Sequence, residues 1–294
     1  MTIDIMMPFY GDPALFRRAV ESVMAQTDPG WRLVVVDDVY PDPAPGEWLR
    51  GIDDARIRYV RNETNLGVSG NFSRCLELVE SDHFVLMGCD DLLEPTYVGR
   101  MRSAIAEHPT ASYFQPGVTV VDGSGAPSSP LPDTVKRLSR PRTRSTIILS
   151  GQKLASSLLR GNWTYFPSIC WSTDVVRRYG FADGFEVVLD LALQLEIICG
   201  GGSLVVLPER LFRYRRHAGS VSSWSAEDGS RFAEERAFFT SARALMADAG
   251  WRHAARVARV HLSSRLNAAS KLPGAIRRRN TADVRSLARH IFGS

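Results

Sequence analysis

The sequence predicts an α/β fold in which a mostly parallel, Rossmann-like sheet is flanked by helices. Three observations support this fold class. Short apolar runs of strand length recur through the first hundred or so residues, helical apolar patterns separate them, and two of the runs end in adjacent aspartates. Alternation of strands and helices favours parallel strands with right-handed crossovers, and such a sheet binds ligands at the carboxyl edge of its strands.

The elements of this first part follow in that order along the chain. The expected strands are apolar runs over residues 3–7, 31–36, 57–60 and 83–87. The expected helices cover residues 13–26, a segment after Gly67 and a segment that starts near Pro95. Asp12 and Pro13 fit the N-cap and first positions of the first helix. A proline-rich loop through Pro45 is expected after the second strand.

The paired carboxylates are the main functional signal. Asp37 and Asp38 end the second expected strand, and Asp90 and Asp91 follow the fourth. Two neighbouring aspartates repel each other unless a cation or a hydrogen-bonding ligand compensates them, and a divalent metal with a phosphorylated ligand does both. The alternative is that one aspartate caps the helix near Pro95 while the other is solvated.

Composition and missing motifs exclude several classes of protein. The 294 residues are 44% hydrophobic, which is enough for a sizeable core. The sequence has no GxGxxG after its first strand and no GxxxxGK[ST], so neither the usual dinucleotide site nor a P-loop is supported. The four cysteines form no CxxC pair, which argues against a zinc site or a disulfide framework. With no visible secretory signal or membrane span, we expect a cytoplasmic protein that does not bind nucleic acid.

Four motifs together resemble those of the family 2 glycosyltransferases. They are Met7-Pro8-Phe9-Tyr10, Val35-Val36-Asp37-Asp38, the stretch from Asn65 to Asn71, and Cys89-Asp90-Asp91, in matching order and spacing over roughly the first 105 residues. The resemblance implies the GT-A fold and an inverting, hexosyltransferase-type reaction. The donor would be a nucleoside diphosphate sugar, UDP- or dTDP-linked, with Mg²⁺ or Mn²⁺ on its diphosphate.

The resemblance also implies roles for single residues of the donor half, residues 1–105. The residues expected at the donor nucleotide are Pro8, Tyr10, Asp38, Asn65 and Asp90. Asp38 would accept a hydrogen bond from the base, Asp90 would contact the ribose, and Asp91 would bind the metal. Tyr10 can stack on the base plane, and its alternative is a packed aromatic with the hydroxyl at the rim. Asp37 is expected to be structural.

The acceptor half is expected over residues 106–225. It begins with a strand over residues 111–121, followed by a loop over residues 122–145 in which Gly, Ser and Pro alternate with basic residues. That loop is either a solvated insertion or an acceptor-side flap whose arginines approach the diphosphate or an anionic acceptor. After a helix over residues 152–160, Trp163 and Tyr165 are candidates for acceptor binding, with core packing as an equal alternative.

Asp190 is the expected catalytic base. The helix over residues 187–198 is nearly all apolar, and its polar residues Glu186, Asp190 and Gln194 align on one face. The family carries an acidic pair here whose last Asp is the general base, and this chain keeps only that Asp, after Leu189. Asp190 would take the proton of the acceptor hydroxyl. Glu186, one turn earlier, is the second candidate for the base. It is also expected to bind the acceptor.

A basic loop is expected to close the site. Short strands over residues 204–207 and 210–214 lead into it, and its His217 resembles the histidine of the family's His-x-x-Ser segment, which approaches the metal. Arg213 to Arg216 would contact the diphosphate, with Arg216 at the donor nucleotide.

A sugar-phosphate nucleotidyltransferase is the alternative function. Such enzymes also combine a nucleotide-binding sheet with paired carboxylates, but they use a glycine-rich, basic loop after the first strand. Residues 8–12 hold one glycine and no basic residue, which argues against this class. A sugar-nucleotide binder without catalysis ranks third.

Residues 226–294 are expected to form a basic helical extension. Residues 251–294 hold ten Lys and Arg but only one acidic residue, Asp283. Apolar residues and arginines occupy neighbouring faces between Trp251 and Leu266, a break is expected at Lys271 to Gly274, and a short helix follows. This pattern is typical of helices that bind anionic membranes, here on the cytosolic leaflet near a lipid-linked acceptor. The alternative is packing against the catalytic body or against a second subunit of a homodimer.

Overall fold

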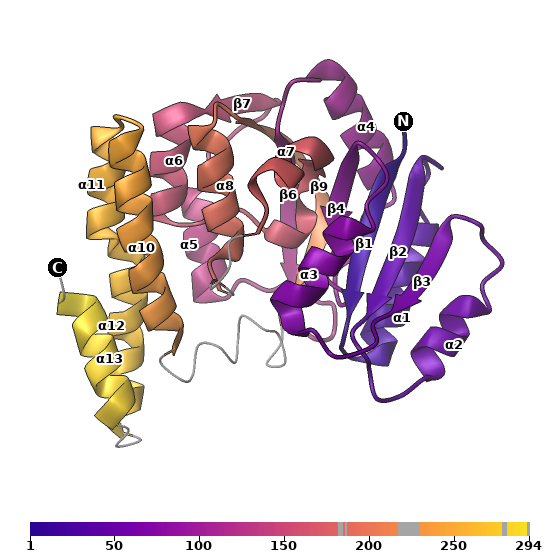
Figure 1. Ribbon diagram of the computed structural model, residues 1–294, viewed down its shortest axis with the longest axis horizontal. Coiled ribbons are helices and arrows are strands. Elements are labelled where there is room, and N and C mark those ends of the chain that lie inside the picture. The colour runs from indigo at the N-terminus through magenta and orange to yellow at the C-terminus, as the bar shows by residue number, and fades with distance from the viewer. Residues whose placement is uncertain (182–184, 186, 217–229, 278–280, 293–294) are drawn as a thin grey trace.

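The computed structural model describes residues 1–181, 185, 187–216, 230–277 and 281–292. In this part of the chain, the strands form one mixed sheet of nine strands in the order β3-β2-β1-β4-β8-β6-β9-β5, with β7 paired to β9 (Figure 1). Glu186 and His217, two of the predicted site residues, lie outside the described residues.

The first half of the sheet is parallel, as predicted. Its strands are β1 (Ile3–Phe9), β2 (Trp31–Asp37), β3 (Ile57–Arg61) and β4 (His83–Leu86). The helices that alternate with them are α1 (Pro13–Met24), α2 (Ala44–Arg50), α3 (Gly67–Glu77) and α4 (Tyr97–Glu107). The Asp12 carboxylate caps α1 by accepting hydrogen bonds from the amides of Ala14 and Leu15, at 2.8 and 3.0 Å. The carboxyl ends of β1, β2 and β4 therefore meet at one edge of the sheet.

A buried ion pair ties the opposite edge of these strands together. Asp4 of β1 accepts hydrogen bonds from the Arg32 guanidinium of β2, at 3.0 and 2.6 Å, and from the amides of Glu80 and Ser81. Burial alone would raise the pKa of Asp4, but Arg32 and the two amides outweigh it and lower this pKa. The ionised carboxylate therefore stabilises the fold at neutral pH.

Two segments predicted as loops contain helices. The proline-rich loop through Pro45 was an incomplete prediction, because α2 begins at Ala44, where the Asp42 carboxylate accepts a hydrogen bond from the Ala44 amide at 3.0 Å. The loop predicted over residues 122–145 contains α5 (Leu131–Ser139). Its first turn carries Asp133 and its last turn is basic, so the charges complement the helix dipole.

The second half of the sheet is mostly antiparallel. Its strands are β5 (Leu92–Leu93), β6 (Tyr113–Val121), β7 (Ile147–Ser150), β8 (Cys170–Ser172) and β9 (Ser203–Arg215). β8 runs antiparallel to both β4 and β6, whereas β6 and β9 are parallel. The two short strands predicted over residues 204–214 are one strand, β9, and the irregularity lies in its register with β6 between Gln115 and Val118. β9 ends at the carboxyl edge of β4, next to the paired aspartates.

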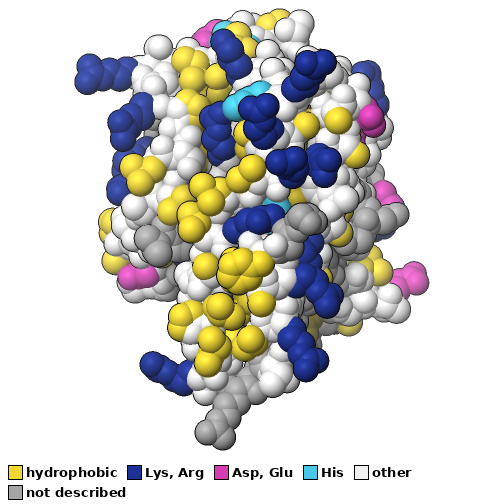
Figure 2. Space-filling model, turned by 90° about the vertical axis from the view of Figure 1, so that its left-hand side faces the viewer, with side chains coloured by type: hydrophobic (Ala, Val, Ile, Leu, Met, Phe, Trp, Pro, Cys, Tyr) yellow, Lys and Arg dark blue, Asp and Glu magenta, His cyan; other side chains and the backbone are white. Residues whose placement is uncertain are grey.

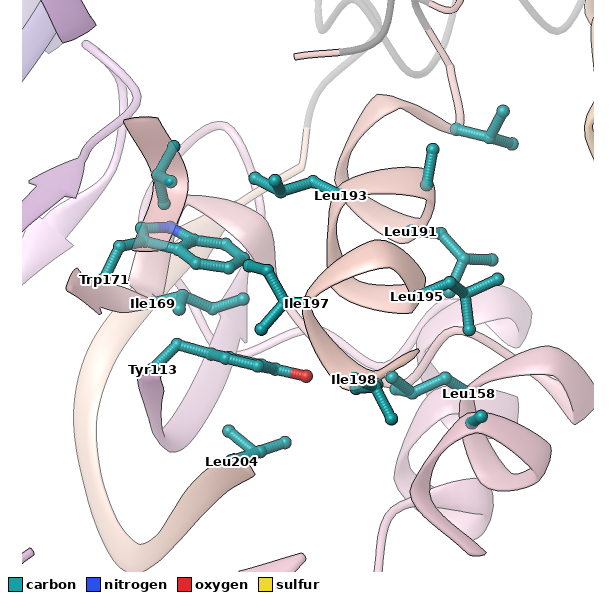
Figure 3. Packing of buried hydrophobic residues seen from close by; sticks show 14 of the residues in the cluster. Tyr113, Leu158, Ile169, Trp171, Leu191, Leu193, Leu195, Ile197, Ile198 and Leu204 are labelled. Carbon is teal, nitrogen blue, oxygen red and sulfur yellow. The ribbon is translucent and has the colours of Figure 1, made fainter. Parts of the chain in front are cut away.

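The core of this half is built around α8 (Leu189–Cys199). The other helical segments here are α6 (Gly151–Arg160), the short 3₁₀ turn Phe166–Ser168, and α7 (Thr173–Tyr179). Figure 3 shows Leu193 and Ile197 of α8 directed toward Trp171, while Leu195 and Ile198 face Leu158 of α6. Each fully buried leucine or isoleucine stabilises the fold by roughly 1.5–3 kcal/mol. Because eight of the eleven residues of α8 are buried, its first turn, which carries Asp190, is held firmly in place.

After the sheet, the described residues form four further helices. They are α10 (Ser230–Asp248), α11 (Arg252–Val260), α12 (Leu262–Arg277) and α13 (Thr281–Phe292). The break predicted at Lys271 to Gly274 is wrong, because Pro273 lies inside α12 and the chain turns instead at His261, whose φ is 31°. Ala254 and Ala258 of α11 are fully buried in the main core, so this face packs on the body as the packing alternative stated.

Candidate active site

The ends of β1 and β2 form one corner of the candidate site. Phe9 pairs with Asp37 in the parallel register, and Tyr10 follows Phe9 directly. The Tyr10 side chain is 56% exposed and meets the ring of Tyr40 edge to face at 5.6 Å, so its face is open to a ligand. Pro8, the second-last residue of β1, is half-buried. The Asp37 carboxylate accepts hydrogen bonds from Arg61 and Tyr59 and from the Tyr40 amide, as expected of a structural residue.

Hydrogen bonds between Asp38 and residues 62–67 hold the segment after β3 against the end of β2. Asp38 Oδ1 accepts hydrogen bonds from the Leu66 amide at 2.8 Å and from Asn62 at 2.9 Å, and its Oδ2 accepts one from the Gly67 amide at 2.9 Å. Asn65 donates to the Asp38 carbonyl at 2.9 Å. A carboxylate oxygen can accept two hydrogen bonds, so Oδ2 retains the capacity to accept one from a base.

Asp90 and Asp91 converge over the turn that follows β4. A Cβ atom at Gly88 would lie 2.7 Å from Asp91 Oδ2 and 3.0 Å from Asp90 Oδ1, so only glycine leaves room for both carboxylates. Asp91 is buried, and its Oδ1 accepts a hydrogen bond from the Arg215 amide at 2.8 Å. Burial, together with the charge of Asp90, raises the pKa of Asp91 well above its usual range. A cation at this point would offset the accumulated negative charge.

The side chain of Arg215 braces this turn from β9. Its Nε donates to the Asp90 carbonyl at 2.8 Å, and its Nη1 donates to the carbonyls of Asp122 and Gly123 at 2.9 and 3.1 Å. The sequence placed Arg215 among the diphosphate contacts, but its guanidinium is buried and holds backbone carbonyls instead. Arg213 likewise pairs with Glu94 at 2.6 Å.

The aspartate pair fits a divalent ion only in part. Within the ranges given above, no three His, Cys, Asp or Glu side chains are gathered closely enough to hold a metal alone. Mg²⁺ commonly takes one or two carboxylates and completes its shell with water and phosphate oxygens. Asp90 and Asp91 fit that pattern, with a bound diphosphate supplying the remaining oxygens.

Asp190 lies in the first turn of α8 and is held from another segment. Its Oδ2 accepts a hydrogen bond from the Asn162 side-chain amide at 2.9 Å. Burial raises the pKa of Asp190, while the charge of Lys136 and the bond from Asn162 oppose that rise. A carboxylate with a raised pKa is a stronger base than an ordinary aspartate, which suits proton abstraction.

Asp190 belongs to a polar chain that sequence reasoning did not find. Thr164 donates to Asn162 Oδ1 at 2.6 Å, and Gln194 donates to Thr164 Oγ1 at 3.1 Å. Lys136 of α5 donates to the Thr164 carbonyl at 2.7 Å, and burial lowers its pKa. The polar face predicted for α8 is therefore directed into the protein, and Gln194 is fully buried on it.

Arg216 and Tyr165 meet on a buried carboxylate. The Arg216 guanidinium lies 2.6 Å from Asp133 Oδ2, and the Tyr165 hydroxyl donates to Asp133 Oδ1 at 3.0 Å. Lys136 Nζ lies 4.6 Å from the centroid of the Tyr165 ring. Trp163 is only 1% exposed and donates to Ser157 Oγ at 3.1 Å, which fits the packing alternative for this residue.

A cavity of about 360 Å³ lies between α5 and the strands β6 and β9. The charged and aromatic side chains of its lining are Asp133, Lys136, Arg137, Arg140, Arg142, Trp163, Tyr165 and Arg210. Five of these carry positive charge and one carries negative charge. The cavity therefore favours an anionic ligand.

A protein-family model described as "Glycosyl transferase family 2" matches residues 4–163, more than half of the chain. The chain belongs to glycosyl transferase family 2. The match contains Pro8, Tyr10, Asn65 and the paired aspartates, and it ends before Asp190 and Arg216.

Curated relatives match most of this chain at 27–29% identity. The uncharacterized protein y4gI of Sinorhizobium fredii is 29% identical over 80% of this chain, which covers 23% of that protein. The succinoglycan biosynthesis protein ExoW of Rhizobium meliloti is 27% identical over 65% of this chain and 60% of its own length. The chain thus spans less than two-thirds of the length of these relatives.

Solved structures confirm the fold class. The S. aureus TarS fragment 1–349 matches with a TM-score of 0.70 at 14% identity over 99% of this chain and 81% of the fragment. The same fragment in complex with UDP-GlcNAc matches with a TM-score of 0.72 at 15% identity, over 99% of this chain and 79% of the fragment. The predicted GT-A architecture with a helical C-terminal region is therefore correct.

Proposed function

We propose that the chain is an inverting glycosyltransferase that transfers a sugar from a UDP- or dTDP-linked donor to an acceptor hydroxyl. Family membership supports glycosyl transfer. A nucleotide-sugar donor is supported by the exposed Tyr10 beside Asp38 and by the solved UDP-GlcNAc complex of TarS, a protein of the same fold. The observation that carries the proposal is the half-buried Asp190 carboxylate, held by Asn162 and with a raised pKa.

The donor would lie across the carboxyl edge of β1, β2 and β4. Tyr10 offers a ring face for the base, and Asp38 Oδ2 can accept a hydrogen bond from its N–H. Asp90, at the end of β4, is the candidate for the ribose hydroxyls. These three contacts orient the nucleotide without a glycine-rich phosphate loop, which the sequence lacks.

Mg²⁺ or Mn²⁺ is the proposed cofactor, with Asp91 as a protein ligand. When bound, such an ion offsets the charge that develops on the leaving diphosphate. Burial and, after it, the charge of Asp90 raise the pKa of Asp91, and a cation beside this carboxylate would offset both effects. Gly88 keeps the space beside the two carboxylates open.

Asp190 is the proposed general base. It would remove the proton of the acceptor hydroxyl as the oxygen attacks C1 of the sugar, while the bond from C1 to the diphosphate oxygen breaks and the nucleoside diphosphate leaves. Attack on the face opposite the leaving group inverts the configuration at C1. Asn162 holds Asp190 through one carboxylate oxygen, which leaves the other oxygen for the acceptor.

The basic cavity is the proposed acceptor side. Arg137 and Arg142 of its lining belong to the segment predicted as a flap, and α5 joins this segment to Asp190 through Lys136. A hydroxyl acceptor that also carries a phosphate or carboxylate would fit this lining, because arginine pairs well with both groups. Saccharides, lipid-linked saccharides and small molecules of this kind are the candidate acceptors.

Donor hydrolysis provides a test that does not require the acceptor. The full chain would be incubated with each of several α-linked nucleoside diphosphate sugars and Mn²⁺, with products followed by NMR. We expect free nucleoside diphosphate and, as the first sugar anomer, the inverted β form, with water in place of the acceptor. Release of the α anomer would contradict inversion. Pyrophosphate formation from a sugar phosphate and a nucleoside triphosphate would instead identify a nucleotidyltransferase.

A further inference from the structure

The outer side of α12 carries an exposed apolar stripe. Leu262, Leu266 and Ile276 are 59%, 61% and 58% exposed, and the exposed Ala269 and Pro273 lie between them in sequence. The spacing of these five residues, i, i+4, i+7, i+11 and i+14, places all of them on one face of the helix. Surface helices normally direct such a stripe into the core, so its exposure requires an explanation.

The helix that carries this stripe is well packed on its other side. The opposite face of α12 carries the buried Ala268 and Ala275, which form a cluster with Leu287 of α13 and Phe232 of α10. Arg265 of α12 also donates to the Ile291 carbonyl of α13 at 3.1 Å. The two helices therefore already have a core of their own, and the exposed stripe is not needed to complete it.

Arginines surround the stripe. The exposed arginines of these helices are Arg252, Arg256 and Arg259 of α11, Arg277 of α12, and Arg285 and Arg289 of α13. Phe292, at the end of α13, is 79% exposed on the same face of its helix as Arg285. The one acidic residue among the described parts of α11–α13, Asp283, is buried. Figure 2 shows apolar side chains along the middle of this side of the molecule, Lys and Arg around them, and acidic side chains at the margins.

We propose that this surface, the exposed side chains of α11–α13, docks on an anionic membrane. Apolar side chains would enter the boundary between headgroups and acyl chains, and the arginines would meet anionic headgroups. A second copy of the chain is the less favourable occupant, because a symmetric interface would bring the same arginines together without opposing carboxylates. None of the described helices is long and apolar enough to span a bilayer, so the proposed contact is peripheral.

The docking proposal does not depend on the proposed transfer reaction. If both are correct, docking also indicates a class of acceptor for that reaction. Figure 1 shows α12 and α13 extending past the lower end of α10, on the side to which the parallel strands point. Docking through the face shown in Figure 2 would hold the protein beside the bilayer, with the carboxyl edge of the sheet facing along the membrane surface. A lipid-linked acceptor is the substrate class that docking at a membrane favours.

Vesicle sedimentation with the full chain tests the proposal. We expect the protein to pellet with vesicles that contain phosphatidylglycerol but not with pure phosphatidylcholine, and we expect high salt to weaken the binding. Replacing Arg285 and Arg289 by Gln should weaken binding about fivefold for each arginine. Arg18→Gln with Arg178→Gln removes the same charge from exposed sites elsewhere and should leave binding unchanged.

The apolar stripe is tested by the triple variant Leu262→Ser, Leu266→Ser and Ile276→Ser, which should lose at least tenfold in vesicle binding. Its matched control is Ile148→Ser, which changes a 56% exposed apolar side chain on β7. Equal pelleting of wild type with both kinds of vesicle, or wild-type binding by a folded triple variant, would overturn the proposal. The proposal would also be overturned if the wild type bound no vesicles but formed a dimer in light scattering, and the triple variant was a monomer. Donor hydrolysis would be measured separately, without vesicles. Failure of vesicle binding can then be distinguished from failure of the proposed transfer activity.

Discussion

The side-chain amide of Asn162 donates a hydrogen bond to the Asp190 carboxylate at 2.9 Å, so the candidate base is oriented by the loop that follows α6. Its own helix is rigidly held, because eight of the eleven residues of α8 are buried, and Figure 3 shows part of this packing. The candidate base thus combines a fixed position with a raised pKa, two properties that a general base requires.

Asp190→Asn should therefore remove transfer while leaving donor affinity intact. The amide keeps the size of the side chain but cannot take the acceptor proton, and general bases typically contribute 10²–10⁴-fold to the rate. Donor binding by calorimetry and turnover by nucleoside diphosphate release would separate the two effects. A turnover rate close to that of the wild type would rule out Asp190, and Glu186 would be the next residue to test.

Lys136→Met should shift the acidic limb of the rate profile to higher pH. The charge of Lys136 lowers the pKa of Asp190, so its removal raises that pKa, and the base becomes protonated at a higher pH than in the wild type. Rates measured across pH would show this shift. Lys153→Met, which removes an exposed lysine of α6, should leave the limb in place. An unchanged limb in Lys136→Met would show that the two side chains are not coupled in the catalytic state.

Asp91→Asn should abolish turnover and metal-dependent donor binding without unfolding the protein. The substitution keeps the acceptor oxygen for the Arg215 amide but removes the charge that a divalent ion requires. Donor titration with and without Mn²⁺ and a thermal unfolding curve would measure both properties. Metal-stimulated activity near the wild-type value would contradict the metal role of Asp91.

Asp4→Asn should destabilise the fold without altering the site. It breaks a buried ion pair with Arg32, which costs on the order of 3 kcal/mol. Because the pKa of Asp4 is lowered in the folded state, its contribution is present above the pKa of the unfolded chain and is lost as pH falls through the folded value. Urea unfolding at several pH values should show the difference from wild type shrinking in acid. The exposed Asp82→Asn should unfold like the wild type, and an equal loss in both variants would exclude the ion pair as the cause.

Much of the fold could be predicted because local pattern and packing agree in the first half of the chain. The helices α2 and α5 were missed although their sequences carry start and stop signals. Each has a proline in its first turn, an acidic residue there, and a basic residue in its last turn. The turn at His261 could not be predicted, because its backbone conformation is accompanied by stacking on Phe239 at 4.6 Å, a tertiary contact.

Residues of the candidate site could be predicted only where they belong to short sequence motifs. Asp38, Asp90 and Asp91 stand at the strand ends to which the motifs assigned them. The partners of these residues were not predictable, because Arg215 is 124 residues from Asp91, and Asn162 is 28 residues from Asp190. The pairing of Arg216 with Asp133 was missed for the same reason, since α5 itself was not predicted.

The position of β8 has a consequence for the order in which the protein is made. β8 lies between β4 and β6 in the sheet, although residues 170–172 are synthesised after both. On the ribosome, β4 and β6 must therefore wait with unpaired edges until β8 emerges, and β9 emerges later still with the Arg215 amide that Asp91 needs. Contacts so distant in sequence form slowly, so the candidate donor site is completed only when most of the chain has been translated.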